Sequence, residues 1–349
     1  MTTPVLSCSP FQLPAEWQPH RACWLAFPSH QDLWGDLLPQ VRAEFSALCR
    51  AIANPDPDTG QIRGEPLKIL VLDAAGEAAA RSYLGEDLRP QFYAVPFGDI
   101  WLRDTAPLTL VNDRGDRQLL CLPFNGWGKK YELPGDAELA RRLAALMGLP
   151  YRRLPLILEG GALEVDGEGT CLSTQQCLLN PNRNPGVTTA EAEKWLQEAL
   201  GVHSVLWIES GLVNDHTDGH IDTLVRFVAP ATVVCMLPWS REDPNYDVLH
   251  AIYQQLQHLQ DARGRSLTIV PIPSPGLVTS VEGEILPASY VNFYIANTTV
   301  VVPTYGSEAD AKAVAAIAEL FPTRTTIGLS ARTLLEGGGA FHCITQQEP

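Results

Sequence analysis

Residues 222–237 read DTLVRFVAPATVVCML, a run of apolar and β-branched side chains bounded by turn-forming residues. Such a run is typical of buried β-strands. Residues 247–262 follow it with the apolar spacing of an amphipathic helix. A strand region followed by a helix is the building unit of an α/β fold, so the question is whether the chain repeats it.

The same alternation extends through the whole chain. The other strand-like runs are LKILVL, RQLLCLPF, GTCLSTQQCLL and NTTVVVP, and the other helical segments are residues 36–54, 136–149, 189–200 and 308–321. Two helix starts carry the three-residue offset of a capping box, namely Thr188 with Glu191 and Ser307 with Asp310. Residues 52–66 are predicted to form a surface loop. Neither G-x-G-x-x-G nor G-x-x-x-x-G-K-[ST] occurs where a nucleotide site needs it, so we expect αβ repeats without a bound nucleotide.

Four stretches combine reactive side chains with glycine or with a strand boundary. They are DIWLRDTAP (99–107), LEGGALEVDGEG (158–169), NDHTDGHID (214–222) and GGGAFHCITQQ (337–347). With Asp104, Glu159, His220 and Cys343 as reference points, the intervals are 55, 61 and 123 residues, and the last is nearly twice 61. This spacing suggests about five units, each sending one loop to a shared axis. The segment 286–307 would then belong to a unit that contributes no catalytic group.

Cys343 is a candidate nucleophile. A cysteine attacks only when a base takes its proton or its pKa is lowered, and His220 could serve that purpose. The three glycines before Cys343 allow the backbone to approach a ligand closely. Glu159 could orient His220. The alternatives are that Cys343 is a buried thiol on a terminal strand, that His220 is a structural histidine and that Glu159 is an exposed loop residue.

Asp104 and Asp222 are candidate ligands for a planar cation. Two facing carboxylates match the parallel N–H groups of a guanidinium. Asp222 lies two residues after His220, which puts both on one face of an extended segment. Trp101 could form an apolar wall beside such a cation. The alternatives are an ordinary Arg103–Asp104 surface pair and a tryptophan in the core.

His216 and His220 support a competing hypothesis. Their H-x-x-x-H spacing would place two zinc ligands on one face of a helix. Thr217, Asp218 and Gly219 between them are poor helix formers, so a metal-dependent hydrolase is the second choice.

Composition narrows the class of protein. Apolar residues make up 45% of the 349 residues, and the net charge is −15, which opposes nucleic-acid binding and suits a small cationic partner. No apolar run is long enough to span a membrane, and the first residues lack a secretory signal, so a cytoplasmic location is expected. The eight cysteines form no C-x-x-C pair. All but Cys343 are interpreted as inert buried thiols, Cys8 included.

These residues resemble the agmatine deiminases, within the larger group that includes bacterial peptidyl-arginine deiminases. The similarity extends over nearly the whole chain. It is carried, in order, by PAEWQPHRACWLAFP, WLRDTAP, FNGWGKKY, EGGALEVDGEGTCLSTQQCLLNPNRNP, DGHID and GGGAFHCITQQEP. The chain differs from the family pattern at Ala340-Phe341 and at His216.

The resemblance implies a single pentein domain over residues 1–349: a five-bladed α/β propeller with pseudo-fivefold symmetry and its active site on the central axis. It implies that agmatine is hydrolysed to N-carbamoylputrescine and ammonia, a step of polyamine metabolism, without metal or organic cofactor. Cys343 would be the nucleophile and would form an S-amidino-cysteine. His220 would be the general acid and base, and Glu159 would orient His220. Asp104 and Asp222 would bind the guanidinium, with Trp101 along the methylene chain. Peptidyl-arginine or free arginine are the alternative substrates, and a homo-oligomer is expected.

Overall fold

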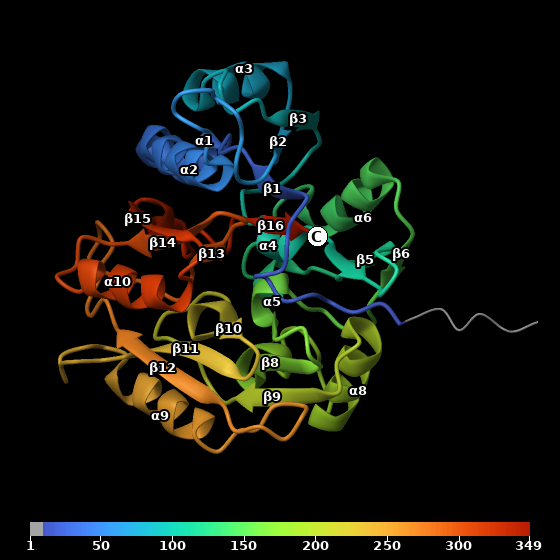
Figure 1. Ribbon diagram of the computed structural model, residues 1–349, viewed down its shortest axis with the longest axis vertical. Coiled ribbons are helices and arrows are strands. Elements are labelled where there is room, and N and C mark those ends of the chain that lie inside the picture. The colour runs from blue at the N-terminus through green and yellow to red at the C-terminus, as the bar shows by residue number, and fades with distance from the viewer. Residues whose placement is uncertain (1–9) are drawn as a thin grey trace, which may run out of the picture.

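The structure, a computed structural model, describes residues 10–349 and consists of five small sheets arranged around a common axis (Figure 1). In each sheet the first strand is antiparallel to the second, and the second is parallel to the third. Parallel neighbours need a crossover, and a helix supplies it in every unit. The five units agree with the spacing of the reactive residues, and the arrangement is the pentein propeller that the family resemblance implies.

Three units follow one plan. The second unit has β4 (Leu108–Val111), β5 (Arg117–Cys121), α5 (Gly126–Lys129), α6 (Asp136–Met147) and β6 (Tyr151–Arg153), preceded by α4 (Leu102–Thr105). The third has η2 (Gly160–Ala162), β7 (Glu164–Val165), β8 (Thr170–Thr174), α7 (Gln175–Leu178), α8 (Thr189–Leu200) and β9 (Ser204–Ile208). The fourth has η3 (Ile221–Thr223), β10 (Val225–Ala229), β11 (Thr232–Leu237), α9 (Tyr246–Leu256) and β12 (Thr268–Pro273).

The fifth unit and the first unit meet at the chain ends. The fifth has β13 (Tyr294–Ile295), β14 (Thr299–Thr304), α10 (Asp310–Leu320), β15 (Thr325–Ser330) and η4 (Leu334–Gly337). The first has β1 (Ala22–Ala26), α1 (Gln31–Trp34), η1 (Gly35–Leu37), α2 (Leu38–Ala53), β2 (Leu67–Val71), α3 (Ala74–Leu84) and β3 (Gln91–Ala94). Its antiparallel first strand is β16 (Gln346–Glu348), from the C-terminus.

The C-terminal strand therefore closes the ring. β16 pairs with β1 in the register Ala22 to Glu348, and all three of its residues are buried. The Glu348 carboxylate accepts from the Trp24 indole N–H at 2.8 Å and pairs with Lys68 and Arg117, each at 2.6 Å. A terminus held in this way can carry an ordered active-site residue, which a frayed end could not.

Most predicted elements are confirmed, with shifted ends. The 222–237 run is two antiparallel strands joined at Pro230-Ala231, with Ala231 at φ 53°. The predicted helix over 36–54 begins as the 3₁₀ turn η1, and Pro39 stands in the first turn of α2, where a missing N–H costs nothing. The run 169–179 is a strand only to Thr174, whose hydroxyl caps α7 at Cys177 N. Helix α3, whose N-cap is Asp73, was not predicted.

One capping prediction is confirmed and one is wrong. Thr188 and Glu191 form the reciprocal capping box of α8. The Ser307 side chain does not accept from Asp310, because α10 begins after Ala309. The Asp310 carboxylate instead accepts from the Tyr305 and Gly306 amides and from the Tyr290 hydroxyl.

The loop and cysteine predictions are largely confirmed. Residues 54–64 are exposed or half-buried, whereas Glu65 is fully buried against His20. Seven cysteines are buried and free, and Cys8 lies outside the described residues. Over residues 10–349, no helix has the length and apolarity required for a membrane span.

Candidate active site

The site residues come from equivalent positions in the five units. In each unit, the segment directly before the first strand turns toward the axis. That segment carries Asp104 in α4, Glu159 before η2, His220 and Asp222 beside η3, Asn292 before β13, and Cys343 before β16. All six are at most 6% exposed. The sequence spacing reflects this repetition.

Gly161 lies at the centre of the site. A Cβ placed on it would fall 2.6 Å from His220 Nδ1, 3.0 Å from Asp104 Oδ1 and 3.1 Å from Asp222 Oδ2. The three side chains therefore surround one point, and only glycine leaves that point free. The Gly161 N–H also donates to Asp104 Oδ1 at 2.9 Å, and Trp127 Nε1–H donates to the other oxygen at 2.9 Å.

His220 is flanked by carboxylates. Its Nε2 lies 3.5 Å from Glu159 Oε2 and its Nδ1 lies 3.8 Å from Asp104 Oδ1. Arg183 fixes Glu159, with its Nε 2.9 Å from Oε1 and 3.0 Å from Oε2, and its Nη1 pairs with Asp218. The predicted contact between His220 and Glu159 is present, and Glu159 is buried rather than an exposed loop residue.

The Cys343 sulfur lies beside Asp222 and Asn292. The Asn292 amide donates to Sγ at 3.1 Å, and Asp222 Oδ2 is 3.7 Å from Sγ. Asn292 Oδ1 also accepts from the Cys343 amide at 3.3 Å. The segment 286–307 thus does contribute a group to the site, contrary to the prediction that its unit contributes none.

Trp101 is buried in the core cluster and its ring lies close to the sulfur, so its place beside the substrate stays a prediction. Gly339 separates the two: a Cβ there would lie 2.6 Å from the Trp101 ring and 3.2 Å from Cys343 Sγ. Asp99 holds the ring by accepting from its Nε1–H at 2.9 Å, and it also accepts from Trp34. Arg103 is buried and bonds Gln347, so the interpretation of Arg103 and Asp104 as a surface pair is wrong.

The charges around the sulfur disfavour a thiolate until a cation is present. Burial, Asp222 and Asp104 together raise the pKa of the Cys343 thiol well above its usual value. Burial lowers the pKa of His220, but Asp104, Cys177 and Glu159 outweigh it and the net pKa is well above the usual range. The imidazolium form of His220 is therefore favoured, and a cation bound between the aspartates would favour ionisation of the thiol.

The local structure around His216 and His220 contradicts the hypothesis of an H-x-x-x-H zinc site. Residues 216–220 form turns and bends rather than a helix, so the spacing does not place both histidines on one face. His216 contacts the Tyr131 hydroxyl through Nδ1 at 3.0 Å. Within residues 10–349, the potential metal-binding cluster is Glu159, Cys177 and His220. There the Arg183 guanidinium already neutralises Glu159.

Four residues of the site were not predicted as members of it: Asn292, Arg183, Cys177 and His342. Cys177 is not a buried thiol remote from the site, since its Sγ lies 3.8 Å from Glu159 Oε2. The interval of 123 residues between His220 and Cys343 was the available signal for Asn292, because a fifth unit had to fall within it.

Known structures share this fold. Agmatine deiminase of Enterococcus faecalis superposes with a TM-score of 0.89 at 30% identity, covering 100% of this chain and 99% of that chain. An amidinotransferase from Microseira wollei shares the fold alone, with a TM-score of 0.52 at 12% identity over 98% of this chain and 97% of its own. Fold and site together define a pentein enzyme that acts on C–N bonds of amidines.

The sequence comparisons identify the family. The agmatine deiminase of Stutzerimonas stutzeri is 36% identical over 364 residues, covering 97% of this chain and 95% of the relative. The family model of the Porphyromonas-type peptidyl-arginine deiminases matches residues 12–349. The chain belongs to this family.

Proposed function

We propose that this protein hydrolyses agmatine to N-carbamoylputrescine and ammonia. The observation that carries the proposal is the convergence of Asp104, Asp222 and His220 on Gly161, with the Cys343 sulfur 3.7 Å from Asp222. Two carboxylates at one point match a planar cation, and a sulfur beside it can reach the central carbon. The full-length similarity to agmatine deiminases supports agmatine as the cation.

The first half of the reaction releases ammonia. Asp104 and Asp222 bind the guanidinium, whose positive charge offsets the carboxylates that raise the pKa of Cys343. The Cys343 thiol gives its proton to water, and the thiolate attacks the guanidinium carbon, forming a C–S bond while the C=N π pair moves to nitrogen. The His220 imidazolium gives its proton to one terminal nitrogen, and the C–N bond breaks. The sulfur then carries the amidino carbon together with the aminobutyl chain.

The second half returns the enzyme to its starting state. Neutral His220 takes a proton from water, and the resulting hydroxide adds to the same carbon. The C–S bond breaks, the leaving thiolate takes up the hydroxyl proton, and the carbon is released as the urea of N-carbamoylputrescine. Glu159, itself fixed by Arg183, keeps His220 in place during both halves.

Free arginine and peptidyl-arginine are the alternative substrates, because both carry the same guanidinium. The family model is named for peptidyl-arginine, whereas the curated relatives described above are agmatine deiminases. The cytoplasmic location and the homo-oligomer stay predictions.

Substrate profiling with the purified chain tests the proposal. We expect ammonia release from agmatine at a kcat/KM at least about 100-fold above that for arginine or an arginyl peptide, since a mismatched polar group in a closed site costs that much or more. A thiol alkylator should abolish the activity and a chelator should leave it unchanged. Preference for arginine, or inactivation by the chelator alone, would overturn the proposal.

A further inference from the structure

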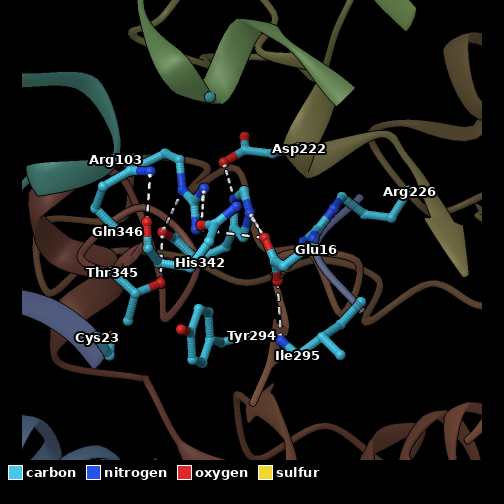
Figure 2. Close-up of polar contacts among 12 residues, drawn as sticks. Glu16, Cys23, Arg103, Asp222, Arg226, Tyr294, Ile295, His342, Thr345 and Gln346 are labelled. Carbon is cyan, nitrogen blue, oxygen red and sulfur yellow. Dashed lines mark hydrogen bonds and ion pairs between the residues drawn. The ribbon is translucent and has the colours of Figure 1, made fainter. Parts of the chain in front are cut away.

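His342 takes part in none of these steps, yet it occupies a central position in the site. It precedes the nucleophile directly and is 1% exposed. Its Nδ1 lies 2.7 Å from Asp222 Oδ2, and its Nε2 lies 2.7 Å from Glu16 Oε2. Figure 2 shows the imidazole between the two carboxyl groups, with Arg226 beyond Glu16.

The two contacts define the protonation state of His342. A carboxylate oxygen can only accept, so each ring nitrogen must donate, whereas a neutral imidazole has a single N–H. With both carboxylates ionised, His342 is an imidazolium. Glu16 is held in the ionised form by two guanidinium groups, because Arg226 and Arg103 both pair with its carboxylate.

The bond to His342 also fixes the plane of the Asp222 carboxylate. Oδ2 is held by His342, while Oδ1 is buried and has no hydrogen-bond partner among residues 10–349. A buried carboxylate oxygen without a partner is costly unless a ligand satisfies it. Oδ2 is the oxygen nearest the point at Gly161, and we infer that a guanidinium bound there also donates an N–H to Oδ1.

We propose that His342 is a positioning residue, held as an imidazolium between Glu16 and Asp222, that keeps Asp222 ionised and turned toward the guanidinium. The proposal rests on the proposed function, because it assigns Asp222 to substrate binding. Glu16 acts behind His342 and is itself held by Arg226 at 3.0 Å and Arg103 at 3.4 Å.

Two substitutions at this position separate orientation from general damage. In His342→Asn the amide overlies Nδ1 and can still donate to Asp222. In His342→Gln the amide overlies Nε2 and can reach only Glu16. We expect the KM for agmatine to rise about 10-fold in the first variant and about 100-fold in the second, with smaller changes in kcat, because displacement of a binding group by about 1 Å has effects of this size.

The pH profile provides a second readout. Burial raises the pKa of Asp222, but the hydrogen bond and charge of His342 bring it below the usual value. Without the imidazolium the pKa of Asp222 rises. On acidification, Asp222 therefore takes up its proton at a higher pH than in the wild type. The acid limb of kcat/KM should therefore move to higher pH in both variants. Both substitutions leave in place the other ionisable groups that face Asp222 and residue 342. These groups are His220, Arg226, Asp104, Cys343, Glu16, Arg103 and Glu164.

His20→Asn is the matched control. His20 is buried to a similar degree and contacts the Glu65 carboxylate at 3.0 Å, with no hydrogen bond to Asp222. This variant should lose stability while keeping the wild-type KM and acid limb. Equal KM values for His342→Gln and His342→Asn, or an unmoved acid limb, would overturn the proposal.

If the His342 variants do not fold, Glu16→Gln replaces them. This change exchanges the carboxylate that orients the His342 ring for a neutral amide. The KM for agmatine should therefore rise with a smaller change in kcat, and an unchanged KM would contradict the proposal. Wild-type protein that releases no ammonia from agmatine would instead refute the proposed function, which keeps the two failures distinct.

Discussion

Ammonia release from agmatine should fall by at least about 10⁴-fold in a Cys343→Ala variant, because the variant lacks the sulfur that forms the covalent intermediate. The fold should persist, since the substitution removes one sulfur atom from a buried turn and costs about 1 kcal/mol of unfolding free energy. A coupled ammonia assay measures the first effect, and thermal unfolding followed by circular dichroism measures the second.

Cys235→Ala is the control for thiol loss in general. Cys235 is a fully buried thiol in β11, and burial raises its pKa to about 12, so it is not a nucleophile. This variant should keep wild-type turnover. Persistent ammonia release by Cys343→Ala, from a preparation free of wild-type protein, would end the nucleophile assignment.

Asp104→Asn and Asp222→Asn should each lower kcat/KM for agmatine by about 100- to 1000-fold. Each change removes a buried charge that faces the substrate cation, and loss of one partner from such a pair costs about 2–5 kcal/mol. Steady-state kinetics measure the effect. Asp113→Asn, at an exposed turn position, is the control and should match the wild type.

Asp222→Asn should also change the reactivity of the Cys343 thiol, in the opposite direction to its effect on turnover. After burial, Asp222 is the main cause of the raised pKa of Cys343, so its neutralisation should bring that pKa down. Alkylation of Cys343 by iodoacetamide in the absence of substrate should therefore become faster while turnover becomes slower. A variant that is slower in both reactions would indicate damage to the site rather than loss of a charge.

The fold was predictable because each unit repeats a pattern of strand and helix with similar spacing. The helix over residues 189–200 was predicted to the residue, since Thr188 and Gly201 mark both ends by local chemistry. The Ser307–Asp310 signal failed because Asp310 bonds to Tyr290 and Tyr305, which tertiary packing brings to it.

The site could be predicted only where reactive side chains lie near glycine or at a strand boundary in the sequence. Asn292 lies in an apolar segment, and its role appears only when β13 brings it to the Cys343 sulfur. Arg183 resembles an ordinary loop arginine until the fold places it against Glu159. Glu16 and His342 are separated by 326 residues, so no local pattern could pair them.

The most direct test of the central claim is mass spectrometry of the enzyme quenched during turnover. The peptide that contains Cys343 should gain the mass of agmatine less that of ammonia, and the adduct should disappear when the substrate is exhausted. Turnover with no adduct on this peptide, or with an adduct on a different side chain, would contradict covalent catalysis by Cys343.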